Sequence, residues 1–309
     1  MITRRTMLLA SLLPTLPGAA GAKTSPAETG AVARSRLGLC MHQTTSAKAG
    51  FQASMEGWSR AGIEYVELTA KSLDDFLKNN TLQAAGRLLG DLNLTAVSCT
   101  PGLTEIWNPH PGRKAALEVW ERRCQQFAEL GLKRIYGSAN TKSKMTLDDY
   151  KAGPACMREA ADIAQKYGMT AMIEFSRSST YISTLPTLLK LIREADHSHL
   201  KPVFDFYHFF TGLSKTEDLD MLKNGEIGHV HFQDVPDLPR ELLDGNSRAV
   251  PGEGIAPLQS TLKKLLDKGY SGPLSVELYL PELQGGDPFE TARRIRAHAE
   301  PVMRSAESL

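Results

Sequence analysis

The sequence predicts a single α/β domain, a (β/α)8 barrel over residues 36–309. The main observation is that eight short apolar runs alternate with longer amphipathic stretches, a pattern typical of βαβ units with a parallel sheet. The second is that glycines suited to the left-handed residue that ends a helix lie where expected helices should stop: Gly62, Gly131, Gly168 and Gly269. Eight such units favour a closed barrel. The strand order cannot be deduced from the sequence, so an open doubly wound sheet is the alternative.

The expected elements follow in chain order. Each strand is a run rich in apolar residues, and the runs lie at 37–42, 63–68, 94–99, 133–138, 170–175, 200–205, 227–232 and 272–278. The helix candidates lie at about 52–61, 79–91, 113–130, 147–167, 184–195, 216–224, 257–268 and 288–304. Thr146 and Thr184 are helix start signals. No shift in composition within 36–304 indicates a second domain.

The composition excludes several classes of protein. Hydrophobic residues make up 41% and charged residues 23% of the chain, which is ordinary for a globular protein and argues against extensive disorder. Thirty-six Lys and Arg against 35 Asp and Glu give a net charge of +1. This balance argues against nucleic acid as the main partner and against a polybasic membrane-surface binder.

The first 22 residues are predicted to be a signal peptide. The Arg4-Arg5 pair precedes a short apolar run and an Ala20-Gly21-Ala22 cleavage pattern, and this order resembles a twin-arginine export signal. An ordinary secretory signal is the alternative. The apolar run is shorter than the roughly 20 residues that span a bilayer, so we expect no stable membrane insertion. The export machinery is then a partner, and the protein is expected to be periplasmic or otherwise exported.

Residues 23–35 are small and polar and are predicted to form a flexible lead-in between the signal and the barrel. The mature chain is expected to begin near Lys23.

Four polar residues stand at the ends of successive strand-like runs: Glu174, Asp205, His231 and Glu277. A carboxylate beside a buried strand is costly unless it is paired or bound to a cation, and in a barrel all four ends meet around one mouth. Each residue alone is more often a salt-bridge partner or a satisfied polar side chain, but four at matching positions predict a joint metal site. Carboxylates with one imidazole suit Mn²⁺, Mg²⁺, Co²⁺ or Zn²⁺.

Further candidates lie close to these ends in the sequence. His208 follows Asp205 by three residues, where it can reach the metal rim or a substrate oxygen, and Asp234 follows His231, where it can orient an imidazole. Arg248 precedes a loop with two glycines and is a candidate to grip a substrate oxygen.

Candidates in the first half of the chain carry a weaker signal. Glu67 lies near the end of the second strand-like run and either faces the pocket or forms a salt bridge. Trp107 follows the third run, where it either stacks on a sugar or packs in the core. His42 and His110 also fall near strand ends and could touch substrate.

Together these motifs resemble the sugar phosphate isomerase/epimerase family of the xylose isomerase-like TIM barrel superfamily. The resemblance covers most of 36–304, is strongest over 170–280, and is carried by Glu174, Asp205-x-x-His208, His231-x-x-Asp234, Arg248-x-x-Pro251-Gly252-x-Gly254 and Glu277.

The resemblance implies one divalent metal, Mn²⁺ foremost, bound by Glu174, Asp205, His231 and Glu277. It also implies that Glu174 and Glu277 take and return a proton beside a carbonyl, which gives a sugar or keto-sugar isomerase or epimerase. The substrate-binding residues would then be His208, Arg248, Asp234, Glu67 and Trp107. The chemistry is consistent, because a cation stabilises the charge of the enediolate that proton abstraction forms.

Three alternatives remain. A lyase or dehydratase would use the same metal and base, with a leaving group on the substrate. A non-catalytic sugar-binding barrel has little need for two opposed glutamates. An apurinic endonuclease needs further histidines, and the candidate segment Asp244-Gly245-Asn246 contains none. Phosphorylated sugars are mainly intracellular and no phosphate-binding glycine-rich motif is found, so the expected substrate carries no phosphate.

Overall fold

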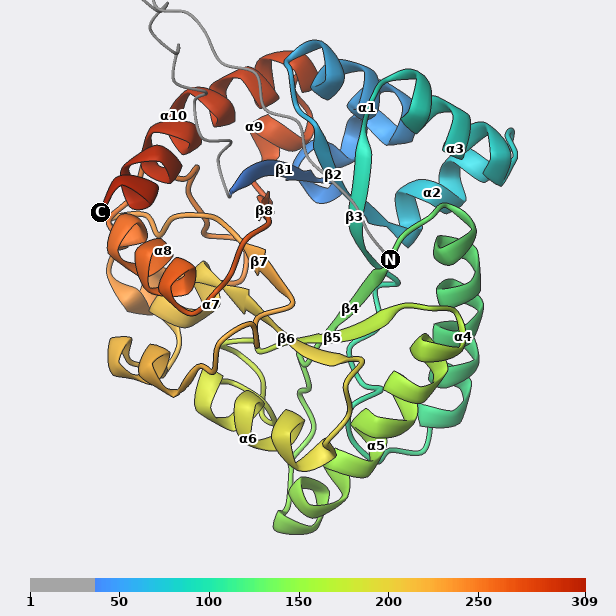
Figure 1. The fold of residues 1–309 in the computed structure, drawn as a ribbon, viewed down its shortest axis with the longest axis vertical. Coiled ribbons are helices and arrows are strands. Elements are labelled where there is room, and N and C mark those ends of the chain that lie inside the picture. Colours follow the sequence, from blue (N-terminus) through green and yellow to red (C-terminus); the bar gives the residue numbers. More distant parts are fainter. Residues whose placement is uncertain (1–36) are drawn as a thin grey trace, which may run out of the picture. The chain divides into compact units, whose positions relative to one another are not determined.

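A ring of parallel strands surrounded by helices forms the fold in the computed structural model, which describes residues 37–309 (Figure 1). The strands are β1 (Gly38–His42), β2 (Tyr65–Thr69), β3 (Thr95–Thr100), β4 (Arg134–Ser138), β5 (Thr170–Glu174), β6 (Leu200–Asp205), β7 (His229–His231) and β8 (Pro273–Val276). The predicted signal segment and lead-in, residues 1–35, lie outside the described residues.

The strands pair in the order β3-β2-β1-β8-β7-β6-β5-β4. The remaining gap lies between β3 and β4, where the Cys99 thiol donates to the Arg134 carbonyl oxygen at 3.4 Å. The barrel is therefore nearly closed, and the predicted (β/α)8 barrel is confirmed against the open-sheet alternative.

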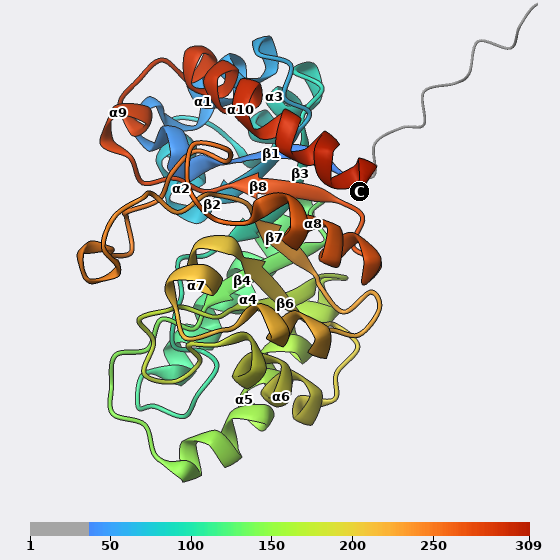
Figure 2. The same cartoon turned by 90° about the vertical axis from the view of Figure 1, so that its left-hand side faces the viewer.

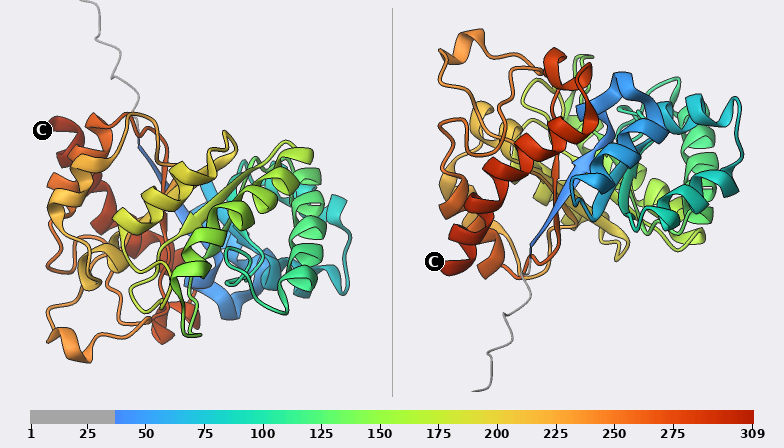
Figure 3. Two further views of the ribbon diagram at one scale, coloured as in Figure 1. Left: turned by 90° about the horizontal axis from the view of Figure 1, so that it is seen from below. Right: turned by 90° about the horizontal axis from the view of Figure 1, so that it is seen from above.

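The α-helices are α1 (Gly50–Arg60), α2 (Ala70–Leu77), α3 (Leu82–Asp91), α4 (Arg113–Glu129), α5 (Leu147–Lys166), α6 (Leu185–Ala195), α7 (Phe206–Thr211), α8 (Leu258–Asp267), α9 (Pro281–Gln284) and α10 (Pro288–Ser308). Short 3-10 helices are η1 (Gln43–Ala49), η2 (Thr216–Met221) and η3 (Arg240–Leu242). Figures 2 and 3 show α10 running beside α1 and α8, so the last helix joins the two ends of the ring of helices.

The structure confirms the predicted helix-starting threonines and helix-ending glycines. The Thr146 side chain accepts from the Asp149 amide and the Thr184 side chain from the Thr187 amide, so both residues cap their helices as expected. The four predicted glycine stops all have positive φ, between 67° and 85°.

Two predicted helices differ from the structure. The stretch predicted as one helix at 79–91 holds only α3, because Thr81 caps a new helix by accepting from the Ala84 amide, and α2 lies before it. The helix predicted at 216–224 is the 3-10 helix η2, which ends at Met221. In addition, α7 was not predicted; the Asp205 carboxylate caps its first turn by accepting from the His208 amide.

The core between barrel and helices is densely aromatic, and Trp58, Trp107 and Trp120 are fully buried in it. Among the helices of residues 37–309, none combines the length and the apolar character that a membrane span requires.

Candidate metal centre and active-site cavity

The four predicted metal ligands come together at the carboxyl ends of four neighbouring strands. Glu174, Asp205 and His231 end β5, β6 and β7, and Glu277 directly follows β8. Asp205 and His231 lie opposite each other in the β6–β7 register. One ligand atom from each of the four residues lies within 4.8 Å of the others, which is the arrangement expected from strand ends that meet at one mouth.

The His231 imidazole is directed into the carboxylates. Its Nδ1 atom lies 2.6 Å from Oε1 of Glu174, 3.6 Å from Oε2 of Glu277 and 3.7 Å from Oδ2 of Asp205. Nδ1 is therefore the ring nitrogen that would join the three carboxylates as a metal ligand.

The charge balance of this cluster favours a bound cation. Asp205 is fully buried, and Glu174 and Glu277 are only 4% exposed. Glu67 contacts the other ring nitrogen of His231, with its Oε2 atom 3.3 Å from Nε2. It is a fourth buried carboxylate beside the three of the cluster. Arg248 supplies one positive charge, with Nη1 2.6 Å from Glu277 and 3.6 Å from Asp205. Because uncompensated buried carboxylates are costly, this oxygen-rich set with one imidazole fits a divalent metal.

Hydrogen bonds hold two of the carboxylates in place. Oδ1 of Asp205 accepts from the His208 amide at 2.6 Å, and Oδ2 accepts from the Gln233 side chain at 2.5 Å. Glu277 accepts from Arg248 at 2.6 Å through Oε2 and from the Tyr279 hydroxyl at 2.8 Å through Oε1. Such supporting contacts orient metal ligands.

The two glutamates have opposite electrostatic environments. Burial raises the pKa of Glu174 to about 7, although His231 opposes the shift. Burial would also raise the pKa of Glu277, but Arg248, followed by His42, outweighs it and holds that pKa at about 2. Burial lowers the pKa of His208 to about 4, so this ring is neutral at physiological pH. One glutamate can therefore carry a proton near neutral pH while the other stays ionised.

A cavity of about 600 Å³ opens over the cluster. Glu174, Glu277, His208 and Arg248 line it, whereas Asp205 and His231 are fully buried beneath. Lys71 and Arg248 are its only Lys and Arg lining residues within the described chain, and both are paired, Lys71 with Asp75 at 2.6 Å and Arg248 with Glu277.

Comparison with known proteins identifies the family. Residues 58–301 match the family described as xylose isomerase-like TIM barrel. The chain belongs to this family. The inosose isomerase of Bacillus licheniformis is 25% identical over 260 residues, which are 82% of this chain and 94% of that protein. The 3-dehydroshikimate dehydratase of Pseudomonas aeruginosa is 25% identical over 85% of this chain and 40% of its own length.

A solved structure, described as IOLI protein with a binding zinc atom, superposes with a TM-score of 0.80 at 22% identity. The match covers 88% of this chain and 100% of that one, and shows a shared fold. Relatives named isomerase and dehydratase point to an enzyme of this fold.

Of the predicted substrate residues in this xylose isomerase-like barrel, His208 and Arg248 line the cavity as expected. Their side chains meet there, with Arg248 Nη2 3.5 Å from His208 Nε2. The Arg248 guanidinium also lies over the Tyr279 ring, 4.9 Å from its centre.

Asp234 is placed differently from the prediction. Its side chain is 1% exposed and does not line the cavity. Oδ2 accepts from the amides of Gly252 and Gly254, each at 3.0 Å, and Oδ1 accepts from Ala256 at 2.9 Å. Asp234 therefore fastens the loop after Arg248 instead of contacting substrate or an imidazole.

Trp107 and Glu67 also lie outside the cavity lining. The Trp107 ring is fully buried, donates to the Gly137 carbonyl oxygen at 3.2 Å and packs edge-on against Trp120. Its role is packing, not sugar stacking. Glu67 lies in the barrel interior, where Oε2 is 3.0 Å from Nε2 of His229 and 3.3 Å from Nε2 of His231, so the salt-bridge alternative describes it.

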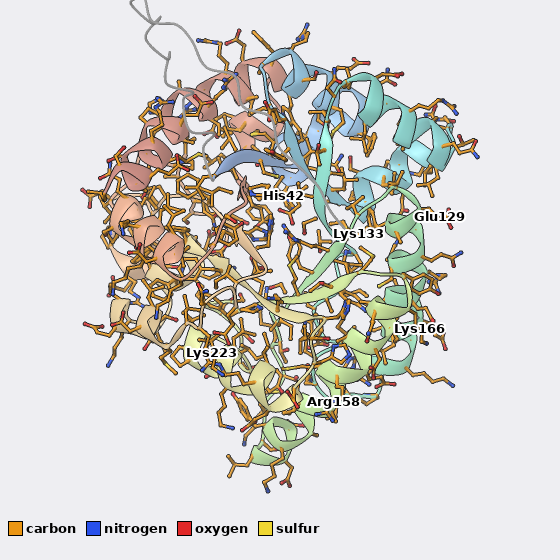
Figure 4. All side chains as sticks on the ribbon, viewed as in Figure 1. His42, Glu129, Lys133, Arg158, Lys166 and Lys223 are labelled. Atoms are coloured by element: carbon orange, nitrogen blue, oxygen red, sulfur yellow. The ribbon has the colours of Figure 1, made fainter. Side chains whose placement is uncertain are left out.

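Three further residues at this centre were not predicted from the sequence. Gln233, Tyr136 and Tyr279 contact Asp205, His42 and Glu277 respectively. Tyr136 lies in the middle of β4 rather than at its end, so the strand-end rule could not find it. His42 ends β1 and lines the cavity at the inner side of the ring (Figure 4), whereas His110 lies outside the cavity lining.

Proposed function

We propose that this protein is a divalent-metal-dependent isomerase or epimerase of a neutral sugar, keto-sugar or keto-inositol. The reaction would proceed by removal of a proton beside a carbonyl and its return to the enediolate. Glu174 and Glu277 would be the proton-transfer residues, and Glu174, Asp205, His231 and Glu277 the metal ligands.

One observation carries the proposal. β7 and β6 separate β8 from β5 in the sheet, so Glu277 and Glu174 flank the cluster with His231 and Asp205 between them. Both glutamates line the cavity while the two central residues are buried beneath it. A substrate over the cluster would therefore have a carboxylate on each side, an arrangement that permits either isomerisation or epimerisation.

The metal and two of the residues that line the cavity would have separate roles. When bound, a divalent cation would stabilise the negative charge that develops on the substrate oxygens. Mn²⁺ is the proposed metal, with Mg²⁺, Co²⁺ or Zn²⁺ as alternatives, and the zinc of the structural neighbour supports a divalent ion in this fold. Neutral His208 would accept or donate a hydrogen bond to a substrate hydroxyl. Arg248 would donate to a substrate oxygen while keeping Glu277 in place.

The cavity supports a substrate without a phosphate group. A phosphate needs unpaired cations or a cradle of backbone amides, and both Lys71 and Arg248 are already paired with carboxylates. The likeness to an inosose isomerase over nearly the whole barrel supports a keto-inositol or a related keto-sugar.

A dehydratase is the second candidate, favoured by the likeness to a 3-dehydroshikimate dehydratase over 85% of this chain. The same base would remove the proton, the electrons of the enediolate would break the bond to a hydroxyl group, and the proton held by the base would pass to that group so that it leaves as water.

Product analysis tests the proposal. Purified protein with Mg²⁺ is incubated with an inosose, a ketose and a 3-keto-glycoside, and products are followed by proton NMR and mass spectrometry. We expect a rearranged product of unchanged mass. Loss of water would establish the dehydratase instead. No conversion of any compound by metal-loaded protein would contradict both and favour a sugar-binding barrel.

We also propose that the protein is exported through a twin-arginine signal, on the support of Arg4-Arg5 and Ala20-Gly21-Ala22. The test is N-terminal sequencing of the protein from fractionated cells. Processing near Lys23 in the exported fraction, lost when both arginines are replaced by lysine, is expected. Unprocessed protein in the cytoplasm would contradict it.

A further inference from the structure

Two cavity-lining side chains, His42 and Tyr136, share a hydrogen bond and have no part in the proposed proton transfer. His42 ends β1 and Tyr136 lies in β4, and the His42 Nε2 atom is 3.1 Å from the Tyr136 hydroxyl oxygen. Both side chains are buried, at 1% and 4% exposure, yet both line the cavity beside Glu174 and Glu277. The Tyr136 ring also packs edge-on against His231, with ring centres 4.9 Å apart.

The direction of this hydrogen bond follows from the other nitrogen of His42. The Thr44 amide donates to His42 Nδ1 at 3.1 Å, so Nδ1 is an acceptor and carries no hydrogen. In the neutral ring the hydrogen must then be on Nε2. A ring whose Nδ1 accepts a hydrogen bond is not the doubly protonated cation, in which both nitrogens donate. His42 Nε2 therefore donates, and the Tyr136 oxygen accepts.

The hydroxyl hydrogen of Tyr136 is consequently free for another acceptor. Within residues 37–309, His42 is the only hydrogen-bond partner of this hydroxyl. Glu277 Oε1 lies 3.8 Å from His42 Nε2, beyond hydrogen-bond range, and accepts from Tyr279 instead. Because Tyr136 lines the cavity, the free hydrogen is available to a group bound there.

We infer that Tyr136 is a catalytic residue that donates a hydrogen bond to the substrate oxygen on which negative charge develops, with His42 as its positioning residue. The inference rests on the proposed function and applies equally to isomerisation and dehydration, since both begin with the same charge on the carbonyl oxygen. Tyr136 keeps its proton throughout, so no co-reactant is required. A preorganised donor at such an oxygen stabilises the transition state more than the ground state.

The test compares Tyr136→Phe with wild type, using an inosose as substrate and Mg²⁺ as metal. The variant keeps the ring against His231 and removes only the hydroxyl. We expect kcat to fall by about 10²–10³, the usual effect of losing one such donor, with little change in KM, Mg²⁺ affinity or Tm. Tyr270→Phe is the matched control, because Tyr270 is a buried tyrosine that donates to the Pro273 carbonyl oxygen and lies outside the cavity lining. It should retain wild-type kcat.

The role of His42 is tested by a double-mutant cycle. His42→Ala should lower kcat in the wild-type background and have little further effect on Tyr136→Phe. His42→Gln should recover part of the loss, since an amide can donate to Tyr136. Wild-type kcat in Tyr136→Phe, or fully additive effects of the two replacements, would overturn the inference while leaving the proposed function intact. An inactive wild type would overturn the proposed function, and this inference with it.

Discussion

The Nδ1 atom of His231 lies 2.6 Å from Oε1 of Glu174, and solvent reaches almost none of either side chain. Burial raises the pKa of Glu174 to about 7. Burial opposes charge on His231, but Glu67 and Glu174 outweigh it and raise the pKa of His231 well above its usual value. Without metal, this pair therefore holds a proton at the position where the two residues would bind a cation.

Metal binding should accordingly release protons and tighten as pH rises. Because both pKa values are raised, protons compete with metal throughout the range below pH 7, and each displaced proton changes the apparent affinity about tenfold per pH unit. Calorimetry of Mg²⁺ and Mn²⁺ binding between pH 5.5 and 7.5, in buffers of different ionisation enthalpy, measures both effects. Affinity independent of pH, with no proton release, would show that the pair is not part of the metal site.

Glu174→Gln should abolish proton transfer while leaving the fold intact. The amide keeps the volume and a hydrogen bond to His231 but cannot act as a base, so we expect kcat to fall by about 10³ or more at saturating metal. Steady-state kinetics and circular dichroism check this result. As a control, Glu226→Gln changes a glutamate that pairs with Arg193 outside the cavity lining and should keep full activity. Activity of Glu174→Gln within tenfold of wild type would contradict the proposed base.

Glu67→Gln should weaken metal binding and leave substrate binding unchanged. Glu67 is fully buried and contacts His231 and His229 from below, and loss of such a partner of a metal-bound histidine typically costs about 10–100-fold in affinity. Titration with Mn²⁺ followed by electron paramagnetic resonance gives the affinity directly. KM at saturating metal should stay near wild type. Unchanged Mn²⁺ affinity would mean that Glu67 does not orient His231.

Asp234→Ala should destabilise the protein. Its carboxylate accepts from the Val235, Gly252, Gly254 and Ala256 amides, and leaving such groups unpaired in a buried site costs about 2–3 kcal/mol or more. We expect Tm to fall by about 5 °C or more. Asp244→Ala, which removes a comparable but exposed loop carboxylate, should have a smaller effect. A wild-type Tm combined with weaker substrate binding would restore the predicted substrate contact.

The sequence predicted that these four candidate ligands would meet, because the information needed for this is local. Each of Glu174, Asp205, His231 and Glu277 stands at or beside the end of a strand, and barrel geometry alone brings those ends together. The glycine stops and the Thr146 and Thr184 caps are local in the same way.

What the sequence could not predict depends on contacts between distant segments. Glu67 and His229 are 162 residues apart, and His42 and Tyr136 are 94 apart, so only the folded barrel shows that they meet. Asp234 also lies just after a predicted strand. Its two carboxylate oxygens, however, accept hydrogen bonds from backbone amides up to 22 residues further along the chain. A residue's position near a strand end therefore predicts its region of the barrel but not the direction of its side chain.

Deuterium incorporation tests the central claim most directly. Protein loaded with Mg²⁺ is incubated with an inosose in D₂O, and loss of the proton beside the carbonyl is followed by NMR. The same sample is measured after metal removal with EDTA, after Mg²⁺ is restored, and with Glu174→Gln. We predict exchange that needs both the metal and Glu174. Exchange that persists in EDTA, or in Glu174→Gln at the wild-type rate, would contradict metal-assisted proton abstraction by this glutamate.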